Sequence, residues 1–96
     1  MQDIKIELDS EGKGSFFLDD GNKRVAEMSF KRDGKKLTVF HTQVSPHLDG
    51  KGVAGKLLEA MADYIRQEKL KVIPLCTYVS TQFKRHPEKY GDILDR

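Results

Sequence analysis

The fold is decided where the chain reads DGKGVAG, at residues 49–55, because the hydrophobic pattern changes there. Before this stretch, apolar residues mostly alternate with polar ones, which is the period of β-strands. After it, apolar side chains follow the spacing of an amphipathic helix that we expect to end near Glu68; they are Val53, Leu57, Leu58, Met61 and Ile65. The stretch therefore predicts a loop that leads from a strand into a helix.

Four strands are predicted before this loop. The apolar sets of the first three are Ile4, Ile6 and Leu8; Phe16, Phe17 and Leu18; and Ala26, Met28 and Phe30. The first strand is expected to be half-buried, with its apolar set on the inner face. Asp33-Gly34 tolerates the positive φ of a tight turn, so it predicts an antiparallel hairpin between the third and fourth strands.

The fourth strand, Leu37 to Val44, carries apolar residues on both faces. Strict alternation places Leu37, Val39 and His41 on one face and Phe40, Thr42 and Val44 on the other. This pattern predicts a central strand that is covered on both sides.

The chain after the first helix supplies one more strand and one more helix. Residues 72–76 predict a short buried strand, and Val79 and Phe83 mark a helix that Thr77 or Ser80 caps and that stops near Pro87. A strand, a helix and a strand in succession imply a parallel pair. We therefore expect one α+β domain over residues 1–96, with a mixed, mostly antiparallel sheet and the order β-β-β-β-α-β-α.

Charge and cysteine content exclude several classes of protein. Lys and Arg total 17 and Asp and Glu 15, so the net charge of +2 indicates a mixed surface without a nucleic-acid-binding stripe. One Cys among 96 residues forms no internal disulfide, and with three scattered His it builds no zinc-finger site. We find no run of the ~20 apolar residues that span a bilayer and no signal-peptide core. We expect a cytoplasmic protein without metal, nucleic acid or membrane partners.

Residues 50–55 match G-x-G-x-x-G, a pattern that binds phosphate in several folds. Glycine allows a ligand close to the backbone, and unpaired N–H groups at a helix start attract anions. A dinucleotide site requires an acidic residue after the next strand, and residues 74–77 contain none. A Walker loop requires Ser or Thr where Leu57 follows Lys56. The loop alone is compatible with an anion site or with a plain turn whose glycines allow tight packing.

Three further motifs accompany the loop: HTQV at residues 41–44, PLCTY at 74–78 and FKRHPEKY at 83–90. Together they resemble the short, stand-alone branch of the GNAT superfamily of N-acetyltransferases, with its His-Thr-x-Val, Pro-x-Cys-x-Tyr and Phe-x-x-His-Pro-Glu-x-Tyr segments. Residues 49–54 are similar to the superfamily's Gln/Arg-x-x-Gly-x-Gly/Ala motif, except that Asp49 stands where the superfamily has Gln or Arg.

The resemblance implies an acyltransferase that moves an acetyl group from acetyl-CoA to an amine of a small molecule or a protein. It implies that pantetheine lies between the strand ending at Val44 and the strand of residues 72–76, where the Val44 N–H polarises the thioester carbonyl. It implies that pyrophosphate is held by the loop and the helix start, at Gly50, Lys51, Gly52, Val53, Ala54, Gly55 and Lys56. The helices that wall the acceptor site of larger members are missing, so an open acceptor side is expected.

Two other interpretations stay open. One is a module that binds CoA or acyl-CoA without efficient transfer, and the other is an interaction domain without a cofactor. Release of free thiol from acetyl-CoA in the presence of amines separates an enzyme from both.

Cys76 and His41 are the candidate catalytic residues. Cys76 is either a small buried residue or a group that touches the thioester and accepts the acetyl group, since it lies beside a helix start, where free N–H groups stabilise a thiolate. His41 is either a satisfied core residue or a base. Because the two residues lie near the ends of neighbouring strands, a Cys–His contact is a hypothesis.

Three residues near the second helix are further cofactor candidates: Tyr78, Phe83 and Lys84. Phe83 is alternatively a core residue. Lys84, with Arg85, either meets the 3′-phosphate of CoA or belongs to a solvated face.

Overall fold

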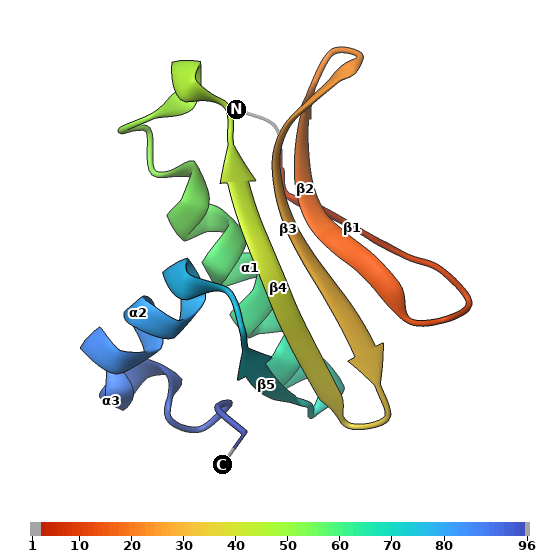
Figure 1. Cartoon of the computed structure of the whole chain (residues 1–96), viewed down its shortest axis with the longest axis vertical. Helices are drawn as coiled ribbons and strands as arrows, with labels where there is room; N and C mark the ends of the chain where they lie inside the picture. Colours follow the sequence, from red (N-terminus) through yellow and green to blue (C-terminus); the bar gives the residue numbers. More distant parts are fainter. Residues whose placement is uncertain (1–2, 96) are drawn as a thin grey trace.

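The computed structural model describes residues 3–95 and shows a five-stranded sheet whose strands lie side by side in chain order (Figure 1). The first four strands pair antiparallel, and the fifth pairs parallel to the fourth. The strands are β1 (Lys5–Leu8), β2 (Lys13–Asp20), β3 (Lys23–Asp33), β4 (Lys36–Val44) and β5 (Lys71–Pro74). The α+β class and the mixed, mostly antiparallel sheet expected from the sequence are confirmed.

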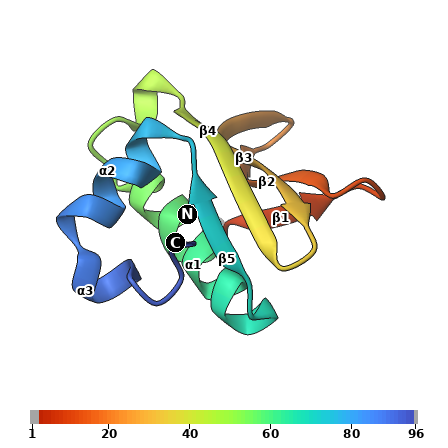
Figure 2. The same ribbon diagram turned by 60° about the horizontal axis from the view of Figure 1, so that its bottom comes forward.

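Within residues 3–95, three helices follow the antiparallel strands: α1 (Val53–Glu68), α2 (Thr77–Arg85) and α3 (Pro87–Tyr90). A 3-10 turn (Pro46–Leu48) precedes α1. In both views α2 and α3 lie beyond the β5 edge of the sheet, while α1 runs alongside β4 and β5 (Figures 1 and 2). No helix within residues 3–95 is long and apolar enough to cross a membrane.

The buried core lies between α1 and one face of the sheet. Because its apolar side chains recur with helical spacing, α1 packs one side against β2, β3 and β4. Phe16, Met28, Phe30, Leu37 and Val39 are buried from the strands, and Val79, Phe83 and Tyr90 join the same cluster from α2 and α3. The opposite face, here called the open face, carries Glu7, Ser15, Glu27, Ser29 and His41, which the strand registers bring together.

The local signals for turns and helix ends are mostly confirmed. Asp33 pairs with Lys36, so the hairpin loop consists of Gly34 and Lys35, with Gly34 at φ 61°. α1 ends at Glu68, as its spacing predicts. The expected cap of α2 was wrong, because Cys76 occupies the N-cap position in place of Thr77 or Ser80. α3 was not expected, although a proline at its first position favours a new helix there.

The predicted burial of β1 was wrong. β1 pairs with β2, but Ile6 and Leu8 are 42% and 45% exposed. Ile4, just before the strand, does pack against the core. β1 is the edge strand of the sheet, beyond the strands that α1 covers, so alternation there produces no buried face.

A β-bulge in β4 overturns the predicted faces of that strand. Val39 pairs with Phe30 and His41 pairs with Ser29, which leaves Phe40 as an extra residue. The bulge shifts the alternation, so His41 lies on the open face and not with Leu37 and Val39. Phe40 is 47% exposed, so the expected cover on both sides of β4 is absent at this point.

Candidate functional site

β4 and β5 separate partway along β4. Their pairing runs from Lys36 opposite Lys71 to Val39 opposite Pro74. The N–H groups of Leu75 and Cys76 then both donate to the Val39 carbonyl, at 3.0 and 2.9 Å, and the chain turns into α2. β4 continues to Val44, past the end of β5 (Figure 1), so among the described residues its last part has no strand partner on that side; this separation of the two strands is here called the gap.

The backbone N–H of Val44 points toward this gap. The Ser45 N–H donates to the Val25 carbonyl at 2.8 Å, which makes Ala26 and Val44 a pair that exchanges no hydrogen bonds with each other. The Val44 N–H is therefore directed away from β3, toward the side that β5 has left. A fixed backbone donor of this kind can polarise the carbonyl of a bound ligand.

The glycine loop leaves the start of α1 rich in unpaired donors. The first helical hydrogen bond runs from Lys56 N–H to the Gly52 carbonyl at 3.1 Å, so the N–H groups of Val53, Ala54 and Gly55 have no partner within the helix. The N-cap residue, Gly52, provides no side-chain hydrogen bond, and the first turn contains no acidic residue. The helix start is thus suited to bind an anion.

The residues that carry these donors line a depression of about 400 Å³, here called the loop depression. Its residues are Val44, Leu48, Asp49, Gly50, Gly52, Val53, Ala54, Gly55 and Tyr78. The structure therefore brings together most of the residues proposed from the sequence for the cofactor. Leu48 was missed, although an apolar side chain inside an otherwise polar loop was a usable signal.

Gly55 is the most informative glycine of the loop. Gly50 and Gly52 adopt φ of 78° and 75°, a region that favours glycine regardless of function. Gly55 is helical, and a Cβ added there would meet nothing within 4 Å. Because glycine in a helix is less stable than alanine, and neither backbone strain nor packing explains it, tight internal packing does not account for this residue.

A second depression of about 200 Å³, here called the helix groove, shares Gly55 and Tyr78 with the loop depression. It is lined in addition by Leu58, Glu59, Gln82, His86, Lys89 and Tyr90. Gln82, His86 and Lys89 are candidate site residues that were not predicted from the sequence. Tyr78, Gln82 and His86 recur every four residues, which was the available signal for a shared side of α2.

The helix groove contains one ion pair and one tyrosine whose pKa is raised. Lys89 Nζ lies 2.8 Å from Glu59 Oε1 across the groove. Burial raises the pKa of Tyr78, and Tyr90 and Cys76 add to the effect. The Tyr78 hydroxyl therefore stays protonated at neutral pH and keeps a hydrogen to donate.

Cys76 lies at the head of α2, beside the gap. The residue is 5% exposed, and its Sγ lies 3.3 Å from Thr42 Oγ1, across the separation of β4 and β5. Its carbonyl accepts the N–H of Ser80 in the first turn of α2. The expected position beside a helix start is confirmed, and its reactivity stays a prediction.

The structure does not bring His41 to Cys76. His41 pairs with Ser29 on the open face, whereas the cysteine contacts Thr42, which pairs with the buried Met28 on the core face. The bulge at Phe40 causes this separation. The hypothesis of a direct Cys–His contact was therefore wrong, while a role of either residue alone stays a prediction.

Four other proposed residues line neither depression: Lys51, Lys56, Phe83 and Lys84. Phe83 is 5% exposed and its ring stacks on Tyr90 at 4.9 Å, which agrees with the core interpretation of this residue. Lys84 is exposed and lies two residues from Gln82, so it projects from a different side of α2 than the groove.

Known proteins with similar sequences include N-acetyltransferases. Residues 15–93 match the family model of GCN5-related N-acetyl-transferases. A relative, protein NATD1 of Xenopus tropicalis, is 28% identical over 85 residues, which cover 88% of this chain and 78% of that protein.

Solved structures resemble the chain over most of its length. A GCN5-like candidate N-acetyltransferase from Staphylococcus aureus, determined by NMR, superimposes with a TM-score of 0.69 and 30% identity over 99% of this chain and 91% of its own. The ribosomal-protein-S18-alanine N-acetyltransferase of Escherichia coli has a TM-score of 0.61 at 21% identity, over 69% of this chain and 43% of that enzyme. The second likeness concerns the fold alone.

Proposed function

The chain belongs to the GCN5-related N-acetyltransferase family, and from this premise we propose that it binds acetyl-CoA in the gap between β4 and β5 and transfers the acetyl group to an amine. One observation supports the proposal most strongly. Val44, whose N–H is directed toward the gap, lines one depression together with Val53, Ala54 and Gly55, whose N–H groups have no partner within the helix. A thioester and a pyrophosphate require donors of these two kinds.

The two depressions suggest a path for the whole cofactor. Pyrophosphate is expected at the start of α1, and the pantetheine arm is expected to reach into the gap toward Val44. The nucleotide end is then expected along the helix groove, which begins at Gly55 and Tyr78. His86 and Lys89 are the groups there that suit a phosphate, so we propose them in place of Lys84.

The proposed transfer requires a neutral amine. An ammonium first loses a proton to water, and its nitrogen lone pair then forms a C–N bond to the thioester carbonyl carbon. The Val44 N–H stabilises the negative charge that develops on the carbonyl oxygen. As the intermediate collapses, the nitrogen releases its second proton to solvent and the C–S bond breaks, and the CoA thiolate leaves and takes up a proton from solvent. No atom of the protein is consumed on this direct route.

Cys76 offers a second route. Its sulfur attacks the thioester carbonyl carbon and takes the acetyl group, while CoA leaves as the thiol. The amine then attacks the Cys76 thioester, the C–S bond to Cys76 breaks, and the Cys76 thiol is regenerated as the amide nitrogen loses its proton. The contact with Thr42 Oγ1 holds the sulfur at the gap in either case. The separation of His41 from Cys76 removes the expected base, and this is the observation that favours the alternative of a CoA-binding module with little transfer.

The experiment is acetyl-CoA turnover against a panel of amines, read as free thiol, with acetyl-CoA affinity measured by titration calorimetry. We expect affinity together with amine-dependent thiol release. Affinity without thiol release would establish the binding module instead, and absence of both would overturn the proposal.

We further propose that residues 1–96 act as one acetyl-CoA-binding domain in the cytoplasm. A single, buried cysteine suits a reducing compartment. Fractionation of cells that express a tagged chain checks this, and recovery of the chain in a membrane or extracellular fraction would contradict it.

A further inference from the structure

One edge of the sheet is left without a partner strand in the part of the chain that the structure describes. Within residues 3–95 β1 pairs with β2 alone, and the helices lie over the sheet or beyond its other edge, at β5 (Figures 1 and 2). Ile6 and Leu8 of β1 are 42% and 45% exposed, because α1 packs against β2, β3 and β4. A free edge with exposed apolar side chains is a template on which a further strand can pair.

The outer edge of β1 presents the backbone groups of Ile6 and Leu8. The Asp9 N–H donates to the Lys13 carbonyl at 2.9 Å, and this bond sets the phase of the ladder between β1 and β2. Two residues earlier, Glu7 therefore directs its N–H and carbonyl at β2, while Ile6 and Leu8 on either side of it direct theirs outward. A strand that pairs with this edge has to bond the backbone of Ile6 and Leu8.

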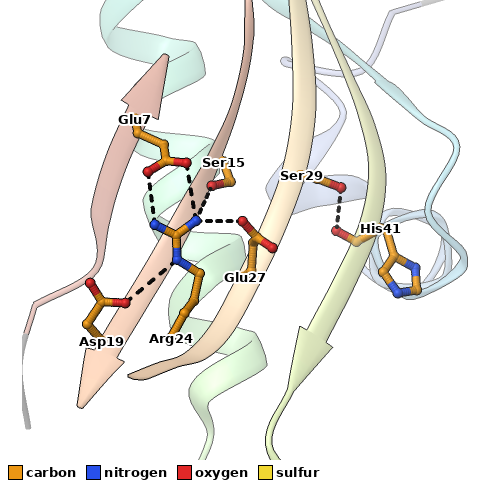
Figure 3. Close-up of polar contacts among 7 residues, drawn as sticks. All are labelled: Glu7, Ser15, Asp19, Arg24, Glu27, Ser29 and His41. Carbon is orange, nitrogen blue, oxygen red and sulfur yellow. Dashed lines mark hydrogen bonds and ion pairs between the residues drawn. The ribbon is translucent and has the colours of Figure 1, made fainter. Parts of the chain in front are cut away.

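Glu7 brings a fixed negative charge to this edge (Figure 3). The Arg24 guanidinium donates to both of its carboxylate oxygens, at 3.2 and 2.9 Å. The same guanidinium donates to Glu27 Oε2 at 2.7 Å, and its Nε lies 3.6 Å from Asp19 Oδ1. One positive charge thus faces three carboxylates, and negative charge remains at Glu7 for a second cation. Lys5, two residues earlier, lies on the same side of β1 and is exposed.

Of the antiparallel pairings between two β1 strands, one sets no like charges within β1 opposite each other. Because outward-facing residues must lie opposite each other, Ile6 of one copy lies opposite Ile4, Ile6 or Leu8 of the other. Opposite Ile4, the pairing sets the two Lys5 side chains against each other. Opposite Leu8, it does the same to the two Glu7 side chains. Like charges directly opposite are destabilising, so the pairing of Ile6 with Ile6 remains.

The pairing centred on Ile6 is self-complementary. Lys5 of each copy then lies opposite Glu7 of the other, on the side of the sheet that Arg24 occupies. On the other side the two Ile6 side chains meet, and the exposed Leu8 of each copy gains an apolar neighbour across the pairing. The same surface serves both copies, as a two-fold symmetric interface requires.

We propose that two copies of the chain associate through their β1 edges, antiparallel and centred on Ile6, so that their two sheets join into one. A second copy is the partner that this edge fits, because β1 complements itself in charge and in apolar contact. The proposal does not depend on acetyl transfer, since β1 and the gap lie at opposite ends of the strand order. In such a dimer the two gaps lie toward the outer ends of the joined sheet.

Sedimentation velocity of the parent over a wide range of protein concentrations tests the association, and we expect a reversible dimer. Ile6→Pro removes the central outward N–H. Because that N–H does not bond β2, an edge strand accepts proline at this position. We expect the variant to be monomeric at every concentration, with amide NMR shifts in β2, β3 and β4 like those of the parent.

A charge reversal tests the register without proline. Lys5→Glu places a carboxylate opposite Glu7 at both symmetric contacts, so the Kd of the dimer should rise by about tenfold, the scale of two cross-strand charge pairs. Lys35→Glu is the matched control, because it makes the same charge change in the exposed turn between β3 and β4, away from β1. Its Kd should equal that of the parent.

Amide hydrogen exchange locates the interface. The N–H groups of Ile6 and Leu8 face outward in a single copy, so we expect their protection to rise with protein concentration in the parent. In Ile6→Pro the protection of Leu8 should not depend on concentration. A parent that stays monomeric, a folded Ile6→Pro protein that still dimerises, or a Lys5→Glu protein with the parent's Kd would each overturn the proposal. Exchange at Ile6 and Leu8 that is independent of concentration would do the same.

Discussion

Gly55 is the residue at which stability and ligand binding are expected to change in opposite directions. Gly55→Ala replaces a helical glycine at a position with free space, so the free energy of unfolding should rise by about 0.5–1 kcal/mol. The added methyl group enters both depressions, and Gly55→Leu fills them further. We predict a higher Tm for the alanine variant with weaker acetyl-CoA affinity, and a larger loss of affinity for leucine, by calorimetry.

Gln67→Ala supplies the control for this prediction. Gln67 is exposed on the last turns of α1, far from the helix start, so the substitution improves helix propensity without entering either depression. Its acetyl-CoA affinity should equal that of the parent. Parent-like affinity in Gly55→Leu would show that the cofactor does not lie on this part of α1.

Cys76 is expected to affect the reaction more than the fold. Cys76→Ala removes a buried sulfur and its contact with Thr42, which costs about 1–2 kcal/mol of stability. If the acetyl group passes through Cys76, the variant loses transfer, and the intact mass of the parent increases by one acetyl group after mixing with acetyl-CoA. If the amine attacks directly, much activity persists and no acetylated protein forms.

Cys76→Ser separates the contact from the chemistry, because serine retains a hydrogen-bonding group opposite Thr42. Unchanged acetyl-CoA affinity and unchanged turnover in folded Cys76→Ala would remove Cys76 from the site. The sequence located this residue at a helix start, but its burial and its neighbour depend on how β4 and β5 separate.

Among the elements, α1 was the most predictable and β4 the least. Five apolar positions at helical spacing are enough to define α1, because one buried side of a helix requires that period. β4 contains a bulge that could not be predicted from the residues of the HTQV segment, because the bulge arises from how β4 pairs with β3. His41 therefore lies on the opposite face of the sheet from the one predicted, and for this reason it does not contact Cys76 as expected.

Phe83 of α2 stacks on Tyr90 of α3, so we predict that Phe83 stabilises the packing of these two helices. Its ring is buried against Tyr90, so Phe83→Ala should lower the free energy of unfolding by about 3–5 kcal/mol. Chemical denaturation measures this loss. Lys84→Ala, the adjacent exposed position, should change neither stability nor acetyl-CoA affinity. A Phe83→Ala protein of parent-like stability but poor affinity would instead make Phe83 a cofactor residue.

At the scale of the whole molecule, arginines form ion pairs between segments that are distant in sequence. Arg24 ties β1 to β3 through Glu7, and Arg66 ties α1 to the segment after α3 through Asp92. The hydrogen bond from Arg24 lowers the pKa of Glu7, and that from Arg66 lowers the pKa of Asp92. Partners so distant in sequence follow only from the assembled fold, which is why the sequence did not identify them.

These lowered pKa values determine whether the stability of the fold rises or falls with pH. A carboxylate whose folded pKa lies below its unfolded value, about 4 for Asp and Glu, stabilises the fold above that pH and loses this contribution as the pH falls. We predict that Glu7→Gln lowers Tm near neutral pH and that the difference from the parent disappears at acidic pH. A difference that grows on acidification would contradict the assigned ion pair.

The proposed cofactor site is tested most directly by titrating the parent protein with acetyl-CoA and following its backbone amides by NMR. We propose that the cofactor binds between the glycine loop and the gap at the end of β4. We therefore expect the largest amide shifts at Val44 and at residues 50–55, followed by Tyr78 and the helix groove. Saturating acetyl-CoA that leaves Val44 and residues 50–55 unchanged, or that shifts only amides elsewhere, would contradict this proposal.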